Sequence, residues 1–216
     1  MTAHIEARKK LKAYLSIGVL LKGLKIEGCM LIEVRWHGRG GQGAVTAAEI
    51  LASAAALEGK WVQAFPSFGA ERRGAPVQAY TRISEKLILD RSFIYEPDIV
   101  VVLDESLLNA DRSNVLMGLK PNGKLVVNSS REPHVLANML RFNGDVAAVD
   151  ATSIAIEVLG VPIVNTAILG AVARIIDTPR KESIIEVMKK KFPPTVAEKN
   201  LKAFTIAYDR TIIGRL

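Results

Sequence analysis

The chain has 216 residues, a net charge of +7 and 49% hydrophobic residues. This length and this share of apolar side chains predict one folded domain with its own core, and they exclude a disordered chain. The single cysteine, Cys29, excludes a disulfide framework, and it also excludes a cysteine-ligated zinc or iron–sulfur site built from this chain alone.

The positive charge is concentrated at the beginning of the chain. Residues 1–29 hold six Lys or Arg and two Glu, so they carry +4 of the net +7. The remaining residues contain no basic run with interleaved aromatics, and we therefore expect no nucleic-acid partner. The histidines, His4, His37 and His134, have no metal-ligand spacing, and we expect isolated surface or loop positions for all three.

Residues 1–29 form a basic N-terminal extension. Their apolar run is far shorter than the ~20 residues that span a bilayer, and no cleavage site of a signal peptide follows it. Two alternatives stay open: a short amphipathic helix, or a start-site artefact with translation beginning at Met30. We expect no membrane association and a cytoplasmic location.

Strand and helix signals alternate through the rest of the chain, residues 30–216. Runs of β-branched residues such as 98–104 are typical of strands buried on both faces of a parallel sheet. Asp104 would end such a strand, at the edge where open α/β sheets bind ligands. We predict a single three-layer α/β domain with a mostly parallel sheet and helices on both faces. The expected strands are 31–37, 60–65, 77–83, 87–89, 98–104, 124–128 and 145–150, and the expected helices are 44–58, 105–119, 152–159, 165–176, 183–191 and 196–208.

A Rossmann-like glycine turn, Gly38–Gly43, follows the first predicted strand and precedes the first helix. Glycines allow close backbone approach to a ligand, and the helix N-terminus favours an anion. Residues 61–65, where a dinucleotide-binding fold places a ribose-binding acid, contain none. No Gly-Lys-Ser/Thr follows the turn, which excludes a P-loop. A stand-alone NADP-binding reductase stays open as an alternative, with Arg72 and Arg73 as its phosphate clamp.

Five motifs occur in the order that is typical of one family. The chain resembles the gamma subunit of pyruvate (2-oxoacid):ferredoxin oxidoreductases from Met30 onward. A Pro-bounded loop with paired arginines, within the second motif, is closer to the pyruvate and branched-chain members, and the choice between these two substrates stays open. The motifs are 35–48, 63–66 with 69–76, 95–98, 149–152 and 165–170.

The resemblance implies a subunit without bond-making chemistry of its own. The family enzyme converts a 2-oxoacid, coenzyme A and oxidised ferredoxin to acyl-CoA, CO2 and reduced ferredoxin. Thiamine diphosphate, Mg and 4Fe–4S clusters are expected in the alpha, beta and delta partner subunits, and ferredoxin is an indirect partner. This chain is expected to assemble with those subunits and to contribute to the coenzyme A side of the site, with no cofactor bound by it alone.

Two groups of residues are the predicted site. The turn and the paired arginines are expected to contact coenzyme A, and the loop residues to contact a partner subunit; Arg72 and Arg73 could serve either role. Asn165 and Thr166 are expected to cap a helix. The coenzyme A candidates are Gly38, Arg39, Gly40, Gly41, Gln42, Gly43, Arg72 and Arg73, and the interface candidates are Phe65, Phe68, Glu71, Arg72 and Arg73.

Overall fold

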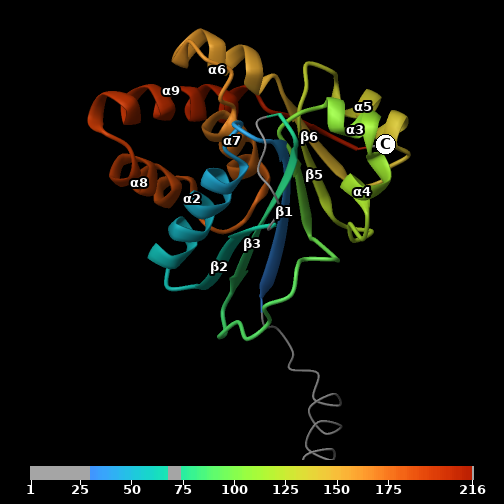
Figure 1. Cartoon of the computed structure of the whole chain (residues 1–216), viewed down its shortest axis with the longest axis horizontal. Coiled ribbons are helices and arrows are strands. Elements are labelled where there is room, and N and C mark those ends of the chain that lie inside the picture. Colours follow the sequence, from blue (N-terminus) through green and yellow to red (C-terminus); the bar gives the residue numbers. More distant parts are fainter. Residues whose placement is uncertain (1–29, 68–73, 216) are drawn as a thin grey trace, which may run out of the picture.

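The computed structural model describes residues 30–67 and 74–215. A seven-stranded sheet runs through the middle of the molecule, with helices on both of its faces (Figure 1). The strands are β1 (Leu31–Arg39), β2 (Trp61–Pro66), β3 (Pro76–Ser84), β4 (Ile99–Val102), β5 (Lys124–Asn128), β6 (Asp145–Val149) and β7 (Ile212–Gly214). The helices are α2 (Ala44–Leu57), α3 (Ser106–Ala110), α4 (Arg112–Leu116), α5 (Pro133–Leu140), α6 (Ala151–Leu159), α7 (Asn165–Ile175), α8 (Lys181–Lys191) and α9 (Pro194–Arg210).

The sheet is mixed, with the strand order β2-β3-β1-β4-β5-β6-β7. Strands β1, β4, β5 and β6 are parallel, whereas β3 pairs antiparallel with β1 and β2, and β7 pairs antiparallel with β6. The predicted α/β domain is confirmed, but antiparallel strands form both edges. The three parallel pairings bring the carboxyl ends of β1, β4, β5 and β6 to one edge of the sheet.

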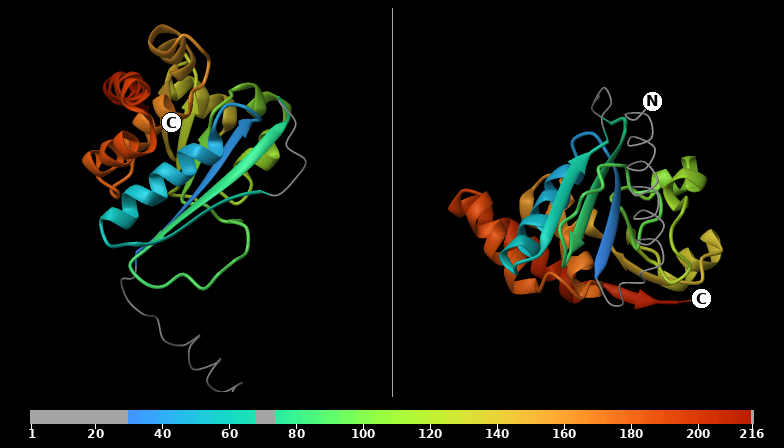
Figure 2. Two further views of the ribbon diagram at one scale, coloured as in Figure 1. Left: turned by 60° about the vertical axis from the view of Figure 1, so that its left-hand side comes forward. Right: turned by 90° about the horizontal axis from the view of Figure 1, so that it is seen from below.

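Alternating side chains of the central strands belong to two separate hydrophobic cores, one on each face of the sheet. In β4, Ile99 and Val101 pack beneath α2 and α7, while Val100 and Val102 pack beneath α3, α4 and α5. This alternation explains why the strand is apolar at every position. Helix α7, which is apolar almost all round, is buried between the sheet and α9 and is therefore core. The views in Figure 2 show α2 lying across β1 and β3 on one face.

Two expected elements differ from the structure, and one observed strand was not expected. Residues 87–89 are a loop and not a strand, and Leu89 is 80% exposed there. The expected helix 105–119 is divided into α3 and α4, because Asp111 between them has non-helical dihedral angles (φ −151°, ψ 45°). Strand β7 was not expected; its three residues become a strand only because β6 offers them a free edge.

Candidate functional site

The glycine turn begins inside strand β1 and not after it. Gly38 and Arg39 still pair with β3, so the turn proper is Gly40–Gly43. Gly41 and Gly43 have φ values of +97° and +82°, which L-residues with a side chain rarely adopt. A Cβ on Gly43 would also lie only 2.6 Å from the amide nitrogen of Asn165. Position 43 is therefore restricted to glycine by both its backbone and its neighbour.

Asn165 and Thr166 do not cap helix α7. Val164 is the N-cap residue, and no side chain caps the helix. The Asn165 side chain instead packs against Gly43, and Thr166 donates a 2.8 Å hydrogen bond to the Asn200 side chain on α9. The expected caps are therefore wrong, because both residues lie within the helix and their side chains link α7 to the glycine turn and to α9.

The carboxylate of Asp104 accepts hydrogen bonds from the polar side chains of the turn. Arg39 Nε donates to Asp104 Oδ2 at 3.0 Å, and Gln42 Nε2 donates to the same oxygen at 3.2 Å. Gln42 also closes the turn, because its Oε1 accepts a 2.8 Å bond from the Arg39 backbone N–H. Arg39 and Gln42 thus have partners within the chain, and their predicted contacts with coenzyme A stay predictions.

The carboxyl of Asp104 is held in its charged form. Partial burial by itself raises the pKa of this group. Hydrogen bonds from Ser106 and Gln42 and the positive charge of Arg39 outweigh the burial and hold the pKa of Asp104 below its ordinary value. At neutral pH this group is therefore a carboxylate that anchors the turn.

The end of the Pro-bounded loop, immediately before β3, is hydrogen-bonded to the glycine turn. The backbone N–H of Gly40 donates to the Ala75 carbonyl at 2.9 Å, and the N–H of Gly74 donates to the Gly40 carbonyl at 3.1 Å. Arg39 adds a 3.1 Å bond to the Gly74 carbonyl. Strand β3, which lies between β1 and β2, brings this end of the loop to the turn.

Part of the predicted site lies outside the described residues. This applies to the coenzyme A candidates Arg72 and Arg73 and to the interface candidates Phe68 and Glu71. Phe65 is described, and it stacks on Tyr80 with ring centroids 5.1 Å apart. Its predicted role at an interface stays a prediction.

An acidic crevice of about 400 Å3 lies at the carboxyl edge of the parallel strands. Asn128, at the end of β5, donates to the Leu103 carbonyl and to Thr152 Oγ1 and so joins β4, β5 and α6. Of the described residues that line this crevice, three are acids and none is a lysine or arginine, so the crevice disfavours a phosphate group. Its polar lining residues include Gln42, Asp104, Glu105, Asn128, Asp150 and Thr152.

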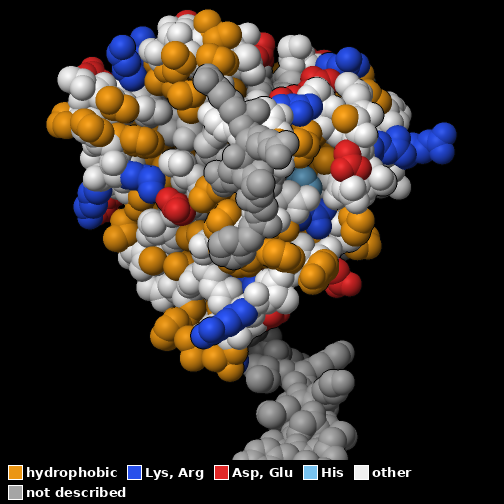
Figure 3. All heavy atoms as spheres, viewed as in Figure 1, with side chains coloured by type: hydrophobic (Ala, Val, Ile, Leu, Met, Phe, Trp, Pro, Cys, Tyr) orange, Lys and Arg blue, Asp and Glu red, His pale blue; other side chains and the backbone are white. Residues whose placement is uncertain are grey.

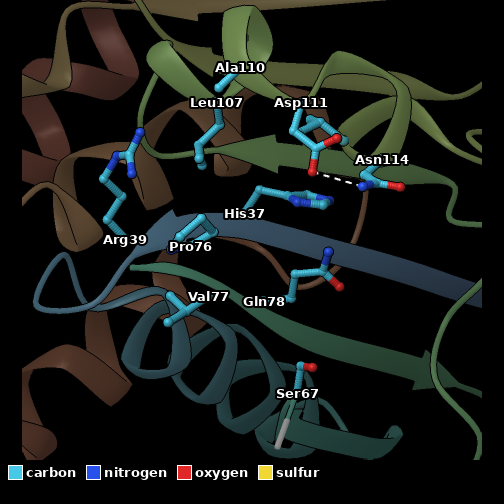
Figure 4. Close-up of a pocket in the computed structure, with 11 residues that line it drawn as sticks. His37, Arg39, Ser67, Pro76, Val77, Gln78, Leu107, Ala110, Asp111 and Asn114 are labelled. Carbon is cyan, nitrogen blue, oxygen red and sulfur yellow. Dashed lines mark hydrogen bonds between the residues drawn. The ribbon is translucent and has the colours of Figure 1, made fainter. Parts of the chain in front are cut away.

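A second cavity of about 360 Å3, the His37 pocket, lies between β3 and the helices α3 and α4 (Figure 4). Arg39 lines this pocket and Asp104 lines the acidic crevice, so their ion pair separates the two. The surface expectation for His37 is wrong, because its side chain points from β1 into the pocket and the residue is only 4% exposed. Alternation along β1 could have placed His37 on the same face as Arg39.

The imidazole of His37 is neutral. Burial, and after it the positive charge of Arg35, lower the pKa of His37 to about 3, although Asp111 acts in the opposite direction. Arg35 Nε donates to His37 Nε2 at 3.0 Å, so Nε2 is the acceptor of the ring and the proton lies on Nδ1.

Comparison with known proteins decides the family. The model of the pyruvate ferredoxin/flavodoxin oxidoreductase family matches residues 33–210. The chain belongs to this family. The gamma subunit common to the pyruvate and ketoisovalerate oxidoreductases of Thermococcus kodakarensis is 54% identical over 187 residues, which are 86% of this chain and 100% of that protein. The pyruvate synthase subunit PorC of Methanothermobacter marburgensis is 49% identical over 83% of this chain and 97% of that protein.

A crystal structure supports the same family fold. The pyruvate oxidoreductase subunit PORC of Thermotoga maritima is 39% identical, with a TM-score of 0.76, and the match covers 86% of this chain and 99% of that chain. The strand-turn-helix unit and the mixed sheet described above are thus the architecture of a pyruvate oxidoreductase family member.

Two general properties of the described residues bear on the role of this family member. Within residues 30–67 and 74–215, no helix is both long and apolar enough to cross a membrane. The same residues contain no group of three or more His, Cys, Asp or Glu side chains that could hold a metal ion. On the face seen in Figure 3, basic and acidic side chains are interspersed among apolar ones.

Proposed function

We propose that this chain is the gamma subunit of a multisubunit pyruvate or branched-chain 2-oxoacid:ferredoxin oxidoreductase. The observation that carries the proposal is the similarity to gamma subunits of both substrate classes over their whole length. The proposed enzyme converts a 2-oxoacid, coenzyme A and oxidised ferredoxin to acyl-CoA, CO2 and reduced ferredoxin. A cytoplasmic location remains part of this proposal.

The partners in this proposal are the alpha, beta and delta subunits. Thiamine diphosphate, Mg and the 4Fe–4S clusters are assigned to these partners, and together they supply the decarboxylation and the electron transfer. The assignment is supported by the sequence, which has a single cysteine. The role proposed for this chain is assembly and the binding of coenzyme A.

The glycine turn is the proposed contact with coenzyme A. Helix α2 has no acid in its first turn and no side chain at its N-cap, so its N-terminal N–H groups are available to an anion. Gly41 is exposed and carries no side chain that would block a ligand. Arg39 adds a positive charge whose side chain is 31% exposed. The acidic crevice next to Asp104 disfavours phosphate, so the phosphates are expected on the Arg39 side of the ion pair.

Omission of this chain tests the proposal. The complex is assembled with and without the chain, and pyruvate-dependent reduction of ferredoxin is measured at increasing coenzyme A concentrations. We expect the complex without this chain to lose activity or to require much more coenzyme A. Equal activity and equal coenzyme A dependence in both preparations would overturn the proposed role. Tight binding of NADPH by the isolated chain would instead favour the reductase alternative.

A further inference from the structure

Arg35 is a buried cation beneath the His37 pocket. The residue is 5% exposed, and no carboxylate of the described residues lies within 4.0 Å of its guanidinium. Its hydrogen bonds go to the carbonyls of Val115 (3.1 Å) and Met117 (2.6 Å), to that of Ile94, and to His37. Backbone carbonyls satisfy its N–H groups but do not neutralise its charge, and a buried charge without a counter-ion is costly.

His37 transmits this charge to the pocket. Its Nε2 accepts the Arg35 bond, so its Nδ1–H is a donor polarised by the cation behind it. No hydrogen-bond partner of Nδ1 occurs among the described residues. His37 is only 4% exposed and lines the cavity, so its Nδ1–H is a donor in the cavity that no described residue uses.

Gln78 supplies a second donor beside the first. It is the register partner of His37 on β3, so the two side chains lie on one face of the sheet with Cβ atoms about 5 Å apart. Its Oε1 accepts a 2.7 Å bond from the Tyr80 hydroxyl, which leaves the amide N–H2 as the free end. Figure 4 shows this nitrogen turned toward His37.

The walls above and beside these donors are partly aliphatic and partly polar, and Arg39, Ser67 and Asn114 are among the polar side chains. Pro76 and Val77 of β3 form one side, and Leu107, Ala110 and Val115 of the helical segments form the other. Among the described residues that line this pocket, Asp111 is the acid; it is exposed and accepts a 2.8 Å hydrogen bond from the Asn114 amide. Among the described residues, the pocket combines two adjacent donors and the buried charge of Arg35 with aliphatic side chains; Arg39 adds a positive charge, and Asp111 is the opposing charge on the exposed side.

We propose that the His37 pocket binds a short aliphatic carboxylate, with the carboxylate on the N–H groups of His37 and Gln78 and the alkyl chain between Leu107 and Pro76. Two adjacent N–H donors suit the two oxygens of a carboxylate, and the anion supplies a counter-charge for Arg35, which has no carboxylate within 4.0 Å among the described residues. A pocket with aliphatic walls and a few convergent polar groups is typical of small-molecule sites. The proposal rests on this pocket alone and does not depend on the proposed function.

Isothermal titration of the full chain with sodium isovalerate at neutral pH tests the proposal, with isopentyl alcohol as the uncharged probe of the same shape. We expect saturable binding of one isovalerate and no measurable binding of the alcohol. Absence of saturable isovalerate binding, or equal binding of the alcohol, would overturn it.

Two substitutions place the binding in this pocket. Gln78→Leu is expected to weaken isovalerate binding about tenfold, because one charge-assisted hydrogen bond is lost. Asp111→Asn is expected to tighten binding about threefold, because it removes the opposing charge from an exposed wall. Asp209→Asn, on the exposed surface of α9, is the matched control and should leave the affinity unchanged. If Gln78→Leu does not fold, the Asp111→Asn comparison still decides: an affinity equal to that of the control contradicts the site.

Discussion

Asp104 keeps the glycine turn in one conformation, because its carboxylate accepts hydrogen bonds from Arg39, Gln42 and Ser106. The Asp104→Asn change removes the charge and leaves the shape, so it isolates the electrostatic part of this contact. We expect the free energy of unfolding at neutral pH to fall by about 1 kcal/mol. Chemical denaturation of both proteins measures this difference, and Asp209→Asn, on the exposed surface of α9, is the control.

The same pair of proteins has a predictable pH dependence. The folded pKa of Asp104 lies below its ordinary value, so the stabilisation is fully present above the unfolded pKa of about 4 and is lost as the pH falls through the folded pKa. The difference between wild type and Asp104→Asn should therefore be constant near neutral pH and shrink in acid. A difference that grows on acidification would contradict the assigned cause.

Gly43 is constrained by its positive φ and by the contact with Asn165, and comparison with Gly59 distinguishes these two effects. Gly43 and Gly59 both have positive φ, but a Cβ at position 59 meets nothing within 4 Å. Gly59→Ala should cost only the left-handed backbone strain of about 1 kcal/mol, and Gly43→Ala should cost more because Asn165 must also move. Thermal unfolding of both variants measures the difference. Equal losses would show that the Asn165 contact does not restrict position 43.

Helices α2 and α8 are joined by one carboxylate at the end of α2. Glu58 accepts hydrogen bonds from the Arg180 backbone N–H at 2.7 Å, from Ser183 Oγ at 2.6 Å and from Thr178 Oγ1 at 3.0 Å. Burial by itself raises the pKa of Glu58, but these hydrogen bonds outweigh it and lower the pKa below its ordinary value. The contact thus stabilises the packing of α8 at neutral pH.

Glu58→Gln is expected to lower the free energy of unfolding by about 1 to 2 kcal/mol, because an amide accepts these bonds less strongly and must orient its own N–H2 group. The loss should disappear in acid, since the stabilisation by a group with a lowered folded pKa is full above its unfolded pKa and is lost as the pH falls through its folded pKa. Glu157→Gln on α6 is the control, because that side chain is 60% exposed. Amide hydrogen exchange in α8 should accelerate in Glu58→Gln and not in the control.

At the scale of the whole complex, we expect the paired arginines of the Pro-bounded loop to contribute to subunit assembly or to the binding of coenzyme A. Reversing Arg72 and Arg73 together to Glu is expected to weaken subunit assembly or to raise the Michaelis constant for coenzyme A, because both roles need positive charge. Reversing Lys190 and Arg210, which are exposed on α8 and α9, controls for the change in net charge. An unchanged complex with unchanged coenzyme A kinetics would contradict both roles.

The sequence predicted those features of the fold that depend on local pattern. The β-branched run of β4, the helix after the glycine turn and the alternation of strands and helices are local signals, and the structure confirms them. The sheet order is not local. Strand β3 lies between β1 and β2, and β7 forms only because β6 is free to pair with it. Asp111 ended a helix that composition alone would have continued.

The candidate site was predicted in part for the same reason. The glycine turn and Asp104 were predictable because each ends a recognisable strand. Their hydrogen bonds, and the burial of His37 in a cavity, depend on which strands are neighbours. The contact between neutral His37 and buried Arg35 could not be predicted from the sequence; alternation along the strand indicates only that both side chains lie on the same face.

We propose above that this family member works as the gamma subunit of a 2-oxoacid:ferredoxin oxidoreductase. Purification of the tagged chain from its native cells, followed by mass spectrometry of everything that co-elutes, tests it most directly. We expect stoichiometric alpha, beta and delta subunits, with thiamine diphosphate and iron–sulfur clusters in the eluted complex. Elution of the chain alone, without a thiamine-dependent partner, would contradict it.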